Sequence, residues 1–387
     1  MDVARKLALA ALSPLALICV AVIRIAARYG YLIRFGELFS SRIGHLAGNL
    51  ECYLCERDAG MHPRTFDIWV PQKAEACNAQ LLRMARRCVR MWPAPLVRLV
   101  SLLNCMFDGW QRHIIEPQQH DRDIYNLYER FKPHLAFTKA ESEYGERQLA
   151  KWGIASRFVC LIVRDGAYLS SLDYHRYRDS DIATYREAAL ALAERGYTVF
   201  RMGAKVAKPF AVDHPRVIDY ATNGMRSDFM DVYLAAHCAF CVTSGTGLDA
   251  VCASFRRPMC FVNYAPFEYL PTWFAGSLAI WKHYEKDGKR MTIEEIAKSD
   301  AGHFMRAEEF EIAGIKLADN TAEEIRDVVL EMEENRLYLR GNLLVPGEVR
   351  QTAFWARFPR SLSKYNQRPL HGEIRMRIGA EFLKGYQ

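Results

Sequence analysis

The chain lacks the features that mark several classes of protein. Its 387 residues contain no low-complexity tract and no internal repeat, and 50% hydrophobic with 25% charged residues does not suit a disordered protein. No dense basic patch with interleaved aromatic residues is present, so nucleic acid is not an expected partner. We assign no DxD-type metal site. These absences leave an ordered globular protein, long enough for two domains.

The eleven cysteines follow no zinc-binding pattern. Several stand inside apolar runs, as small hydrophobic residues of a reducing compartment do. Cys52 and Cys55 form one CxxC pair, but no second Cys or His pair lies at a matching distance, so both are expected in a core. We therefore predict no metal site and no cofactor.

The N-terminus carries the longest apolar run, Leu7 to Ile23, flanked by basic residues such as Arg24 and Arg28. The net charge of the chain is +7, and its first 100 residues hold the whole excess. A basic and aromatic segment follows the run instead of a small-residue cleavage site, which favours a membrane-associated helix over residues 1–28. We expect this helix to contact the cytoplasmic surface of a bacterial inner membrane, and whether it spans the membrane or lies on it stays open. The alternative is a buried first helix.

The first half of the remaining chain predicts one α/β unit, residues 29–156. Apolar runs at 31–35 and 66–70 read as strands, with a turn-like segment over 36–49 between them. Helical spacing of apolar residues continues from about 75 to 110. Thr138, with Glu141 three residues on, opens a helix that Gly153 ends.

The second half alternates strands and helices and predicts a second unit, residues 157–345, with a C-terminal extension over 346–387. Such alternation is typical of a doubly wound parallel sheet. We therefore expect an α/β fold of two Rossmann-like domains facing a cleft. The strands are expected at 158–163, 197–202, 216–220, 239–242 and 258–263, and the helices at 182–194, 228–236 and 248–255.

The strongest local motif is the segment Ala239 to Asn263, which reads as a strand, a turn of small residues, a helix and a second strand. The glycines permit close backbone approach, and N–H groups at a helix start attract anions, so the turn predicts a phosphate cradle; plain packing is the alternative. The residues assigned to nucleotide binding here and at neighbouring strand ends are Arg201, Gly203, Thr243, Ser244, Gly245, Thr246, Gly247, Asp249 and Asn263.

Two arginines follow buried strands. Arg164 comes directly after one strand with Asp165 beside it, and Arg201 ends the next. Because guanidinium groups fork two oxygens, we expect both to hold a diphosphate, with Asp165 orienting Arg164. A surface ion pair is the alternative for Arg164.

Polar segments elsewhere supply candidate substrate residues. The long loop around residues 170–181 is dense in planar and charged groups, and Asp179 or Ser180 is expected to cap the helix after it. The segment 226–228 reads first as a helix N-cap. The substrate candidates are Arg42, Asn49, Tyr174, Arg178, Arg226 and Asp228.

His45 is the best candidate for a general base. It stands among small residues at a strand-to-helix turn, where an imidazole can take a proton from a sugar hydroxyl. A structural histidine is the alternative, and Asp67 or Asp165 could take the same role.

Several segments together resemble a bacterial glycosyltransferase family of surface-polysaccharide loci: RIGHLAGN, VRDGAYL, DYHRYRDSDIATY, RMG and RSDFMDVYLAAHCAFCVTSGTGLDA. More distantly, VRD and SDF…TSGTG are similar to motifs of the α1,6-fucosyltransferase and protein O-fucosyltransferase group, which has the GT-B fold and needs no metal. The resemblance implies Arg164 as a diphosphate ligand and Ser244 to Thr246 as part of a nucleotide pocket. That group commonly has a histidine where this chain has Ile162, which argues against GDP-fucose itself.

These observations together predict a metal-independent glycosyltransferase. Its partners would be a nucleotide-sugar donor and a polysaccharide or lipid-linked glycan acceptor. Two alternatives stay open: an NAD(P)-dependent oxidoreductase using Gly245-x-Gly247, and a non-catalytic sugar-binding protein. In a dinucleotide site, an acidic residue should follow the glycines by about 20 residues. Near that distance this chain has Asn263 and then Glu268.

Overall fold

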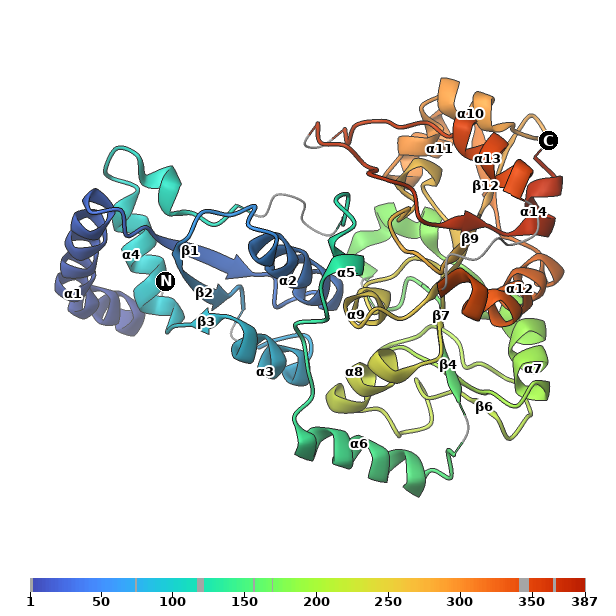
Figure 1. Cartoon of the computed structure of the whole chain (residues 1–387), viewed down its shortest axis with the longest axis horizontal. Coiled ribbons are helices and arrows are strands. Elements are labelled where there is room, and N and C mark those ends of the chain that lie inside the picture. Colours follow the sequence, from blue (N-terminus) through green and yellow to red (C-terminus); the bar gives the residue numbers. More distant parts are fainter. Residues whose placement is uncertain are drawn as a thin grey trace. The chain divides into compact units, whose positions relative to one another are not determined.

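A computed structural model of the chain describes residues 3–73, 75–116, 122–155, 157–168, 170–340, 348–364 and 367–386. The chain divides into two compact units, the first over residues 1–121 and 134–136, the second over 122–133 and 137–387. Both units are α/β, each built on a parallel sheet, and an apolar helix stands at the N-terminus, as the sequence predicts (Figure 1). The units part at residue 121, earlier than the predicted border at 156, because the helix that Thr138 opens packs its Gly145 against Tyr233 of unit 2.

Unit 1 contains a three-stranded sheet in the order β1-β2-β3. Its strands run parallel, with Ile33 of β1 opposite Phe66 of β2. In chain order its elements are α1 (Val3–Arg28), β1 (Ile33–Leu38), α2 (Ile43–Asp58), β2 (Phe66–Pro71), α3 (Ala79–Cys88), β3 (Arg90–Met91), α4 (Ala94–Asn104) and the 3-10 turn η1 (Trp110–His113).

One expectation for unit 1 is wrong. The segment 36–49 is not a turn, because β1 continues to Leu38 and α2 begins at Ile43; Leu46, Leu50 and Leu54 are buried one turn apart, which outweighs the glycines of the segment. The helical spacing of 75–110 belongs to two helices, α3 and α4. Strand β3 interrupts it, and α4 restarts after Pro93, whose ring suits a helix start and not its interior.

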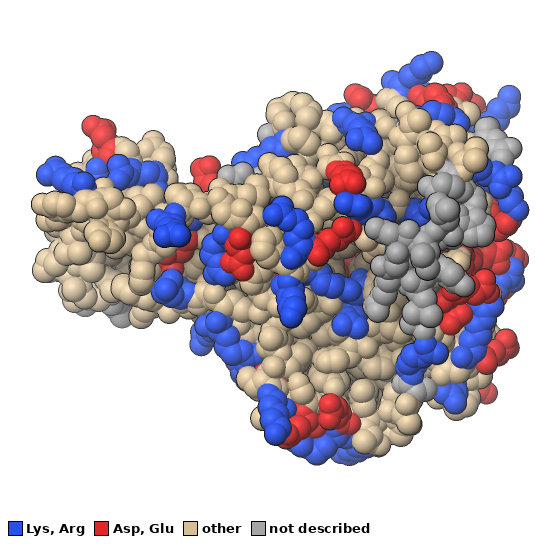
Figure 2. Space-filling model, in the orientation of Figure 1, with Lys and Arg blue, Asp and Glu red and all other residues tan. Residues whose placement is uncertain are grey.

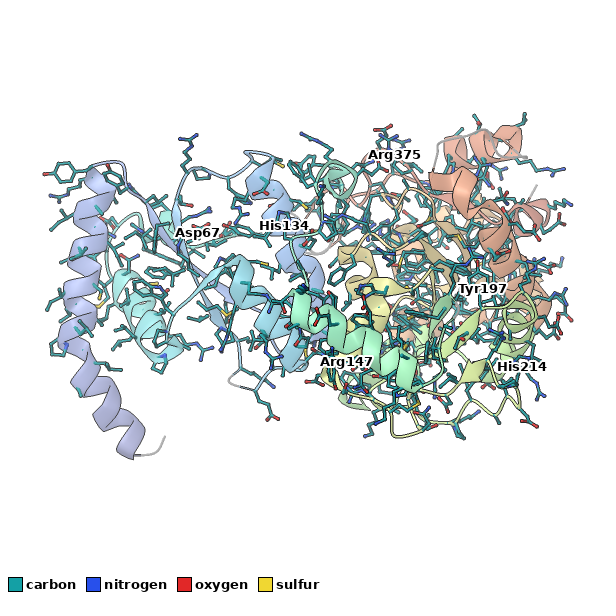
Figure 3. All side chains as sticks on the ribbon, turned by 60° about the horizontal axis from the view of Figure 1, so that its bottom comes forward. Asp67, His134, Arg147, Tyr197, His214 and Arg375 are labelled. Carbon is teal, nitrogen blue, oxygen red and sulfur yellow. The ribbon has the colours of Figure 1, made fainter. Side chains whose placement is uncertain are left out.

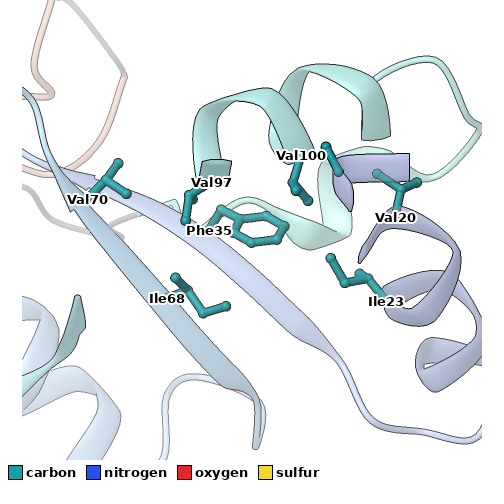
Figure 4. Packing of buried hydrophobic residues seen from close by; sticks show 8 residues of the cluster. Val20, Ile23, Phe35, Ile68, Val70, Val97 and Val100 are labelled. Atoms are coloured by element: carbon teal, nitrogen blue, oxygen red, sulfur yellow. The ribbon is translucent and has the colours of Figure 1, made fainter. Parts of the chain in front are cut away.

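Helix α1 is part of the core of unit 1. Its buried side chains Ala16, Val20 and Ile23 join a cluster with residues of both long strands and of α4 (Figure 4). By length and composition, its window Ala11–Arg28, with mean hydropathy 1.9, is the one candidate membrane span among the described residues.

Unit 2 contains a seven-stranded sheet in the order β13-β9-β8-β7-β4-β5-β6, with every described pair parallel. Helices α7 and α12 pack together on one face, and α8 and α9 pack together on the other (Figure 1). Unit 2 also contains a small antiparallel sheet, whose strands pair in the order β11-β10-β12. The sheet is therefore doubly wound, as predicted.

Up to β8, the strands and helices of unit 2 follow the predicted alternation. The elements are α5 (Leu127–Arg130), α6 (Lys139–Lys151), β4 (Phe158–Ile162), η2 (Ser170–Arg178), η3 (Ile182–Tyr185), α7 (Arg186–Glu194), β5 (Thr198–Arg201), β6 (Val217–Ile218), α8 (Asp228–His237), β7 (Cys241–Thr243), α9 (Asp249–Ser254), β8 (Met259–Tyr264), η4 (Phe267–Tyr269), β9 (Leu278–Trp281), β10 (His283–Lys286), β11 (Lys289–Arg290), α10 (Ile293–Lys298), η5 (Ala301–His303), α11 (Ala307–Ile312), β12 (Ile315–Ala318), α12 (Ala322–Arg340), α13 (Glu348–Arg357), β13 (Arg377–Ile378) and α14 (Ala380–Lys384).

Residues of the C-terminal extension pack back onto unit 2. Strand β13 adds to the edge of the sheet beside β9, and the side chain of Gln351 in α13 bonds both the N–H and the carbonyl of Ile378. Arg122 also donates to the carbonyl of Leu370 at 2.9 Å. The predicted border between residues 345 and 346 lies outside the described residues.

Candidate functional site

The candidate site lies at the carboxyl edge of the parallel sheet in unit 2. Strands β4, β7 and β8 are neighbours there, so the segments that follow them meet at one edge. The N–H of Arg164, just after β4, donates to the Ser244 hydroxyl, just after β7, at 2.8 Å. Ligands of doubly wound sheets bind at this edge. The sequence therefore placed Arg164 and the 243–247 turn correctly beside each other.

Arg164 is held by Asp179 and not by Asp165. Its Nε donates to Asp179 Oδ1 at 3.1 Å, and its side chain is 16% exposed. Asp165 instead accepts from the backbone N–H groups of Ala167 and Ala207. The expectation that Asp165 orients Arg164 is not met.

Arg178 is the second cation beside Arg164. One of its Nη groups donates to the carbonyl of Gly245, and its Nε is buried without an acceptor among the described residues. Burial, followed by the charge of Arg178, lowers the pKa of Arg164. Burial also raises the pKa of Asp179, even though Arg164 and Lys282 lie near it. Burial thus disfavours the charged forms of both Arg164 and Asp179.

Sequence reasoning missed Lys282. Its Nζ donates to the carbonyl of Asp179 at 2.6 Å and pairs with Asp319 at 2.7 Å, and it is 4% exposed. The residue follows the buried run Leu278–Trp281 in the same way that Arg164 follows β4. A basic residue directly after an apolar strand is the sequence signal that could have identified Lys282.

The 243–247 turn is present, but its N–H groups are largely satisfied from within. The N–H of Gly245 donates to Thr243 Oγ1 at 3.0 Å, and that of Thr246 donates to Asp249 Oδ2 at 2.8 Å. Leu248 donates to the Thr246 hydroxyl at 3.4 Å. Helix α9 is only six residues long. The turn therefore shapes the site, and the positive charge comes from the arginines.

Asp249 and Asn263 have structural partners in place of the predicted nucleotide. The Asp249 carboxylate also accepts from the Thr243 hydroxyl at 2.9 Å, and burial raises its pKa to about 6. Asn263 is fully buried and donates from Nδ2 to the Tyr185 hydroxyl at 3.1 Å, while its N–H donates to Asn320. Both side chains therefore have hydrogen-bond partners within unit 2.

Arg201 is also directed elsewhere. Its guanidinium is 1% exposed and bonds Asp219 Oδ1 and the carbonyl of Lys208, each at 3.1 Å. Gly203 follows with φ of +157°, and a Cβ there would meet Val206 at 2.6 Å. These residues hold the 203–219 loop, so the predicted pairing of Arg201 with Arg164 on one diphosphate is not what the structure shows.

The other substrate candidates of unit 2 are spread out. Arg226 pairs with Asp231 at 2.7 Å and with Asp228 at 3.6 Å beside the start of α8, where Ser227 accepts from the Met230 N–H and caps the helix as predicted. The ring of Tyr174 lies 4.7 Å from the Arg306 guanidinium.

Asp181, and not Asp179 or Ser180, accepts from the N–H of Ala183 and caps η3. Asp179 is instead the partner of Arg164.

The candidates of unit 1 gather at the start of α2. His45 lies in the first turn of α2, just after the connection from β1, and its Nδ1 is 3.3 Å from Asn49 Oδ1. Arg42 is the residue before the helix and is exposed. Asp67, the alternative base, stands at the start of β2 and faces Arg34 at 2.9 Å (labelled in Figure 3). It therefore lies at the opposite edge of this sheet from His45.

One group in unit 1 has the donor atoms of a metal site. Atoms of Glu51, Cys55 and His134 lie within 4.8 Å of one another. Both His134 nitrogens already face carboxylates, Glu51 at 3.1 Å and Asp58 at 2.9 Å (His134 is labelled in Figure 3). These carboxylates raise the pKa of His134 against the effect of burial. The contacts suit an imidazolium held between two carboxylates. Cys52 and Cys55 are buried, as expected.

No protein-family model and no curated protein matches the chain. Among solved structures, it is similar to a family 9 glycosyl transferase from Veillonella parvula DSM 2008, at 12% identity and a TM-score of 0.45, over 80% of this chain and 98% of that one. It is similar to E. coli ADP-heptose lps heptosyltransferase II, at 15% identity and a TM-score of 0.40, over 78% and 100% of the two chains. It is also similar to UDP-GlcNAc 2-epimerase from Neisseria meningitidis bound to UDP-GlcNAc, at 11% and 0.29, over 79% and 100%. With TM-scores below 0.5, these similarities carry neither family nor activity over to this chain.

Proposed function

We propose that this chain is a glycosyltransferase that takes its sugar from a nucleotide-sugar donor. One observation carries the proposal: Arg164 and Arg178 stand together at the carboxyl edge of a doubly wound sheet, beside the 243–247 turn. Only Nε of the Arg164 guanidinium has an acceptor among the described residues. Its two terminal nitrogens are the fork that binds a diphosphate bidentately.

The proposed role of the arginines in transfer is electrostatic. When the sugar leaves, negative charge builds on the diphosphate of the donor, and fixed cations in a partly buried site stabilise that charge. Asp179 holds Arg164 by Nε, so the fork is oriented before the donor binds. We propose that these side chains supply the charge compensation without a metal ion. Transfer that continues in the presence of a chelator would support this point.

For the acceptor we propose a glycan hydroxyl deprotonated by His45. The support is local: the imidazole is half-buried in the first turn of α2, next to the exposed Arg42. A polysaccharide or lipid-linked glycan as acceptor, and a location at the cytoplasmic side of the inner membrane, also belong to the proposal.

The experiment is a binding screen followed by a turnover assay. Purified protein is mixed with UDP-, GDP-, CMP- and ADP-linked sugars and with NAD(H), and its thermal unfolding is followed. Selective stabilisation by one sugar nucleotide, together with its turnover to the free nucleoside diphosphate or monophosphate, supports transfer. A response to NAD(H) alone would favour the oxidoreductase, since a dinucleotide also carries a diphosphate. Sugar-nucleotide binding without turnover on any acceptor would favour a binding protein.

A further inference from the structure

Helix α1 turns one face to the core of unit 1 and presents an apolar face to the outside. Ala16, Val20 and Ile23 are at most 6% exposed. On the other side, Leu15, Leu17, Ile18, Val22 and Ile25 are 48–61% exposed. The outward face of a helix on a water-soluble surface is normally polar. This face instead has the character of a surface that meets lipid or another apolar partner.

A groove of about 500 Å³ runs beside this face. Its apolar lining comes from α1 and from Phe107, and its basic lining comes from Arg24, Arg28 and Arg112. None of the residues that line it is acidic. Arg24 is fixed by Asn104 at 3.2 Å, and Arg112 donates to the carbonyl of Ala27 at 3.3 Å. An apolar trough with cations along it is complementary to a phosphate that carries an acyl chain.

The exposed apolar surface continues past the groove. Tyr29 and Tyr31, which follow α1, are 78% and 74% exposed, and Leu102 and Met106, near the end of α4, are 67% and 78% exposed. Tyrosines are enriched where a protein surface meets lipid headgroups. In Figure 2 the end of unit 1 that carries α1 is largely uncharged, with Lys and Arg side chains and an acidic side chain along one edge. The pattern is an apolar face with a basic border.

The same contacts oppose a membrane-spanning α1. The candidate span Ala11–Arg28 contains Val20 and Ile23, which belong to the core cluster with Phe35 and Val97 (Figure 4). It also contains Arg24, whose guanidinium bonds Asn104 and the carbonyl of Asp108. Crossing a bilayer would remove these side chains from unit 1 and place the cation in hydrocarbon. A helix lying along the surface keeps every one of these contacts.

We propose that this face docks unit 1 on an anionic membrane, with α1 in the plane of the headgroups. The groove takes the phosphate of one lipid on Arg28 and Arg112 and the upper part of its acyl chain along Leu17, Ala21 and Ile25. Charge complementarity selects the occupant, because the groove lining holds three arginines and one histidine, no acidic residue, and is otherwise apolar. The inference concerns unit 1 alone and does not depend on the proposed transfer reaction.

The test is sedimentation of the full chain with vesicles of phosphatidylcholine, with or without phosphatidylglycerol. We expect binding that needs the anionic lipid and weakens with salt. Ile18→Gln and Ile25→Gln should each lower the partition coefficient roughly tenfold, because each removes one side chain from the apolar contact. The matched control is Ile312→Gln in α11, where the residue is 88% exposed. It should bind as the parent protein does.

The basic part is tested separately. Arg28→Gln and Arg112→Gln should each weaken binding to anionic vesicles by roughly fivefold. The control is Arg147→Gln, whose side chain is 66% exposed on α6 (labelled in Figure 3). Circular dichroism of each variant checks that α1 remains helical.

Several results would overturn the proposal. Equal binding to neutral and anionic vesicles would contradict the proposed selection of anionic lipid, and binding that survives alkaline carbonate would indicate a membrane span. Full competition by inorganic phosphate would point to a soluble anion in the groove. If the protein does not bind vesicles and instead forms a dimer that Ile18→Gln dissociates, the face would bind a second copy of the chain.

Discussion

Replacing Arg164 with alanine tests the proposed diphosphate site most directly. The substitution removes the guanidinium fork, whose two terminal nitrogens have no acceptor among the described residues. A hydrogen bond to a charged group contributes about 1.5–3 kcal/mol, so losing both should cost roughly 3–4 kcal/mol of binding. That corresponds to about a 100- to 1,000-fold weaker binding of the nucleotide diphosphate.

The fold should survive this substitution. The N–H of residue 164, which donates to Ser244, is a backbone group and remains. Asp179 loses Arg164 but keeps Lys282 near it. The Arg164–Asp179 pair is partly exposed, and a pair of this kind contributes about 1 kcal/mol or less. We therefore expect the melting temperature to fall by only a few degrees.

The assay is calorimetric titration with the sugar nucleotide found in the screen, followed by kcat/KM for transfer. Arg164→Lys should restore part of the affinity, because it returns the charge without the fork. Arg195→Ala is the control: this arginine of unit 2 pairs with Glu333 and Glu334 outside the site. An Arg164→Ala protein that binds and turns over the donor like the parent protein would refute the assignment of the site.

Three further changes have expected outcomes. Gly245→Ala should weaken donor binding and cost about 1–3 kcal/mol of stability, because φ is +77° and the new Cβ would lie 2.8 Å from the Tyr264 ring; unchanged unfolding and affinity would contradict this. Burial raises the pKa of Asp231 from 3.8 to about 6, so its proton is held more tightly in the folded protein. Relative to Asp231→Asn, the parent should therefore lose up to about 3 kcal/mol of stability as the pH rises from 4 to 7, measured by urea unfolding at each pH; parallel curves would refute it. His45→Gln should lower kcat about 100-fold or more with donor affinity unchanged, and unaltered kcat would assign the base elsewhere.

The sequence by itself determined the α/β class and most strands of the parallel sheets. Fully buried parallel strands are continuous apolar runs, and Phe158–Ile162 is one of them. Local chemistry also determined helix starts: Thr138 and Glu141 form the expected capping box, and Ser227 caps α8. These features depend on neighbours a few residues apart, so no tertiary information was needed. The same reasoning put Arg164 at a strand end in the candidate site.

Tertiary structure alone decided which partner each of these side chains has. Asp179 lies fifteen positions after Arg164 along the chain and became its partner, whereas the adjacent Asp165 faces the other way. The donors of the 243–247 turn proved to be satisfied by Thr243 and Asp249, and Arg201 proved to bond Asp219. The packing of the C-terminal residues on unit 2 and of α1 on unit 1 also follows from contacts between distant segments. A one-dimensional pattern indicates which face of an element is buried, but the direction of a polar side chain depends on residues that only folding brings near it.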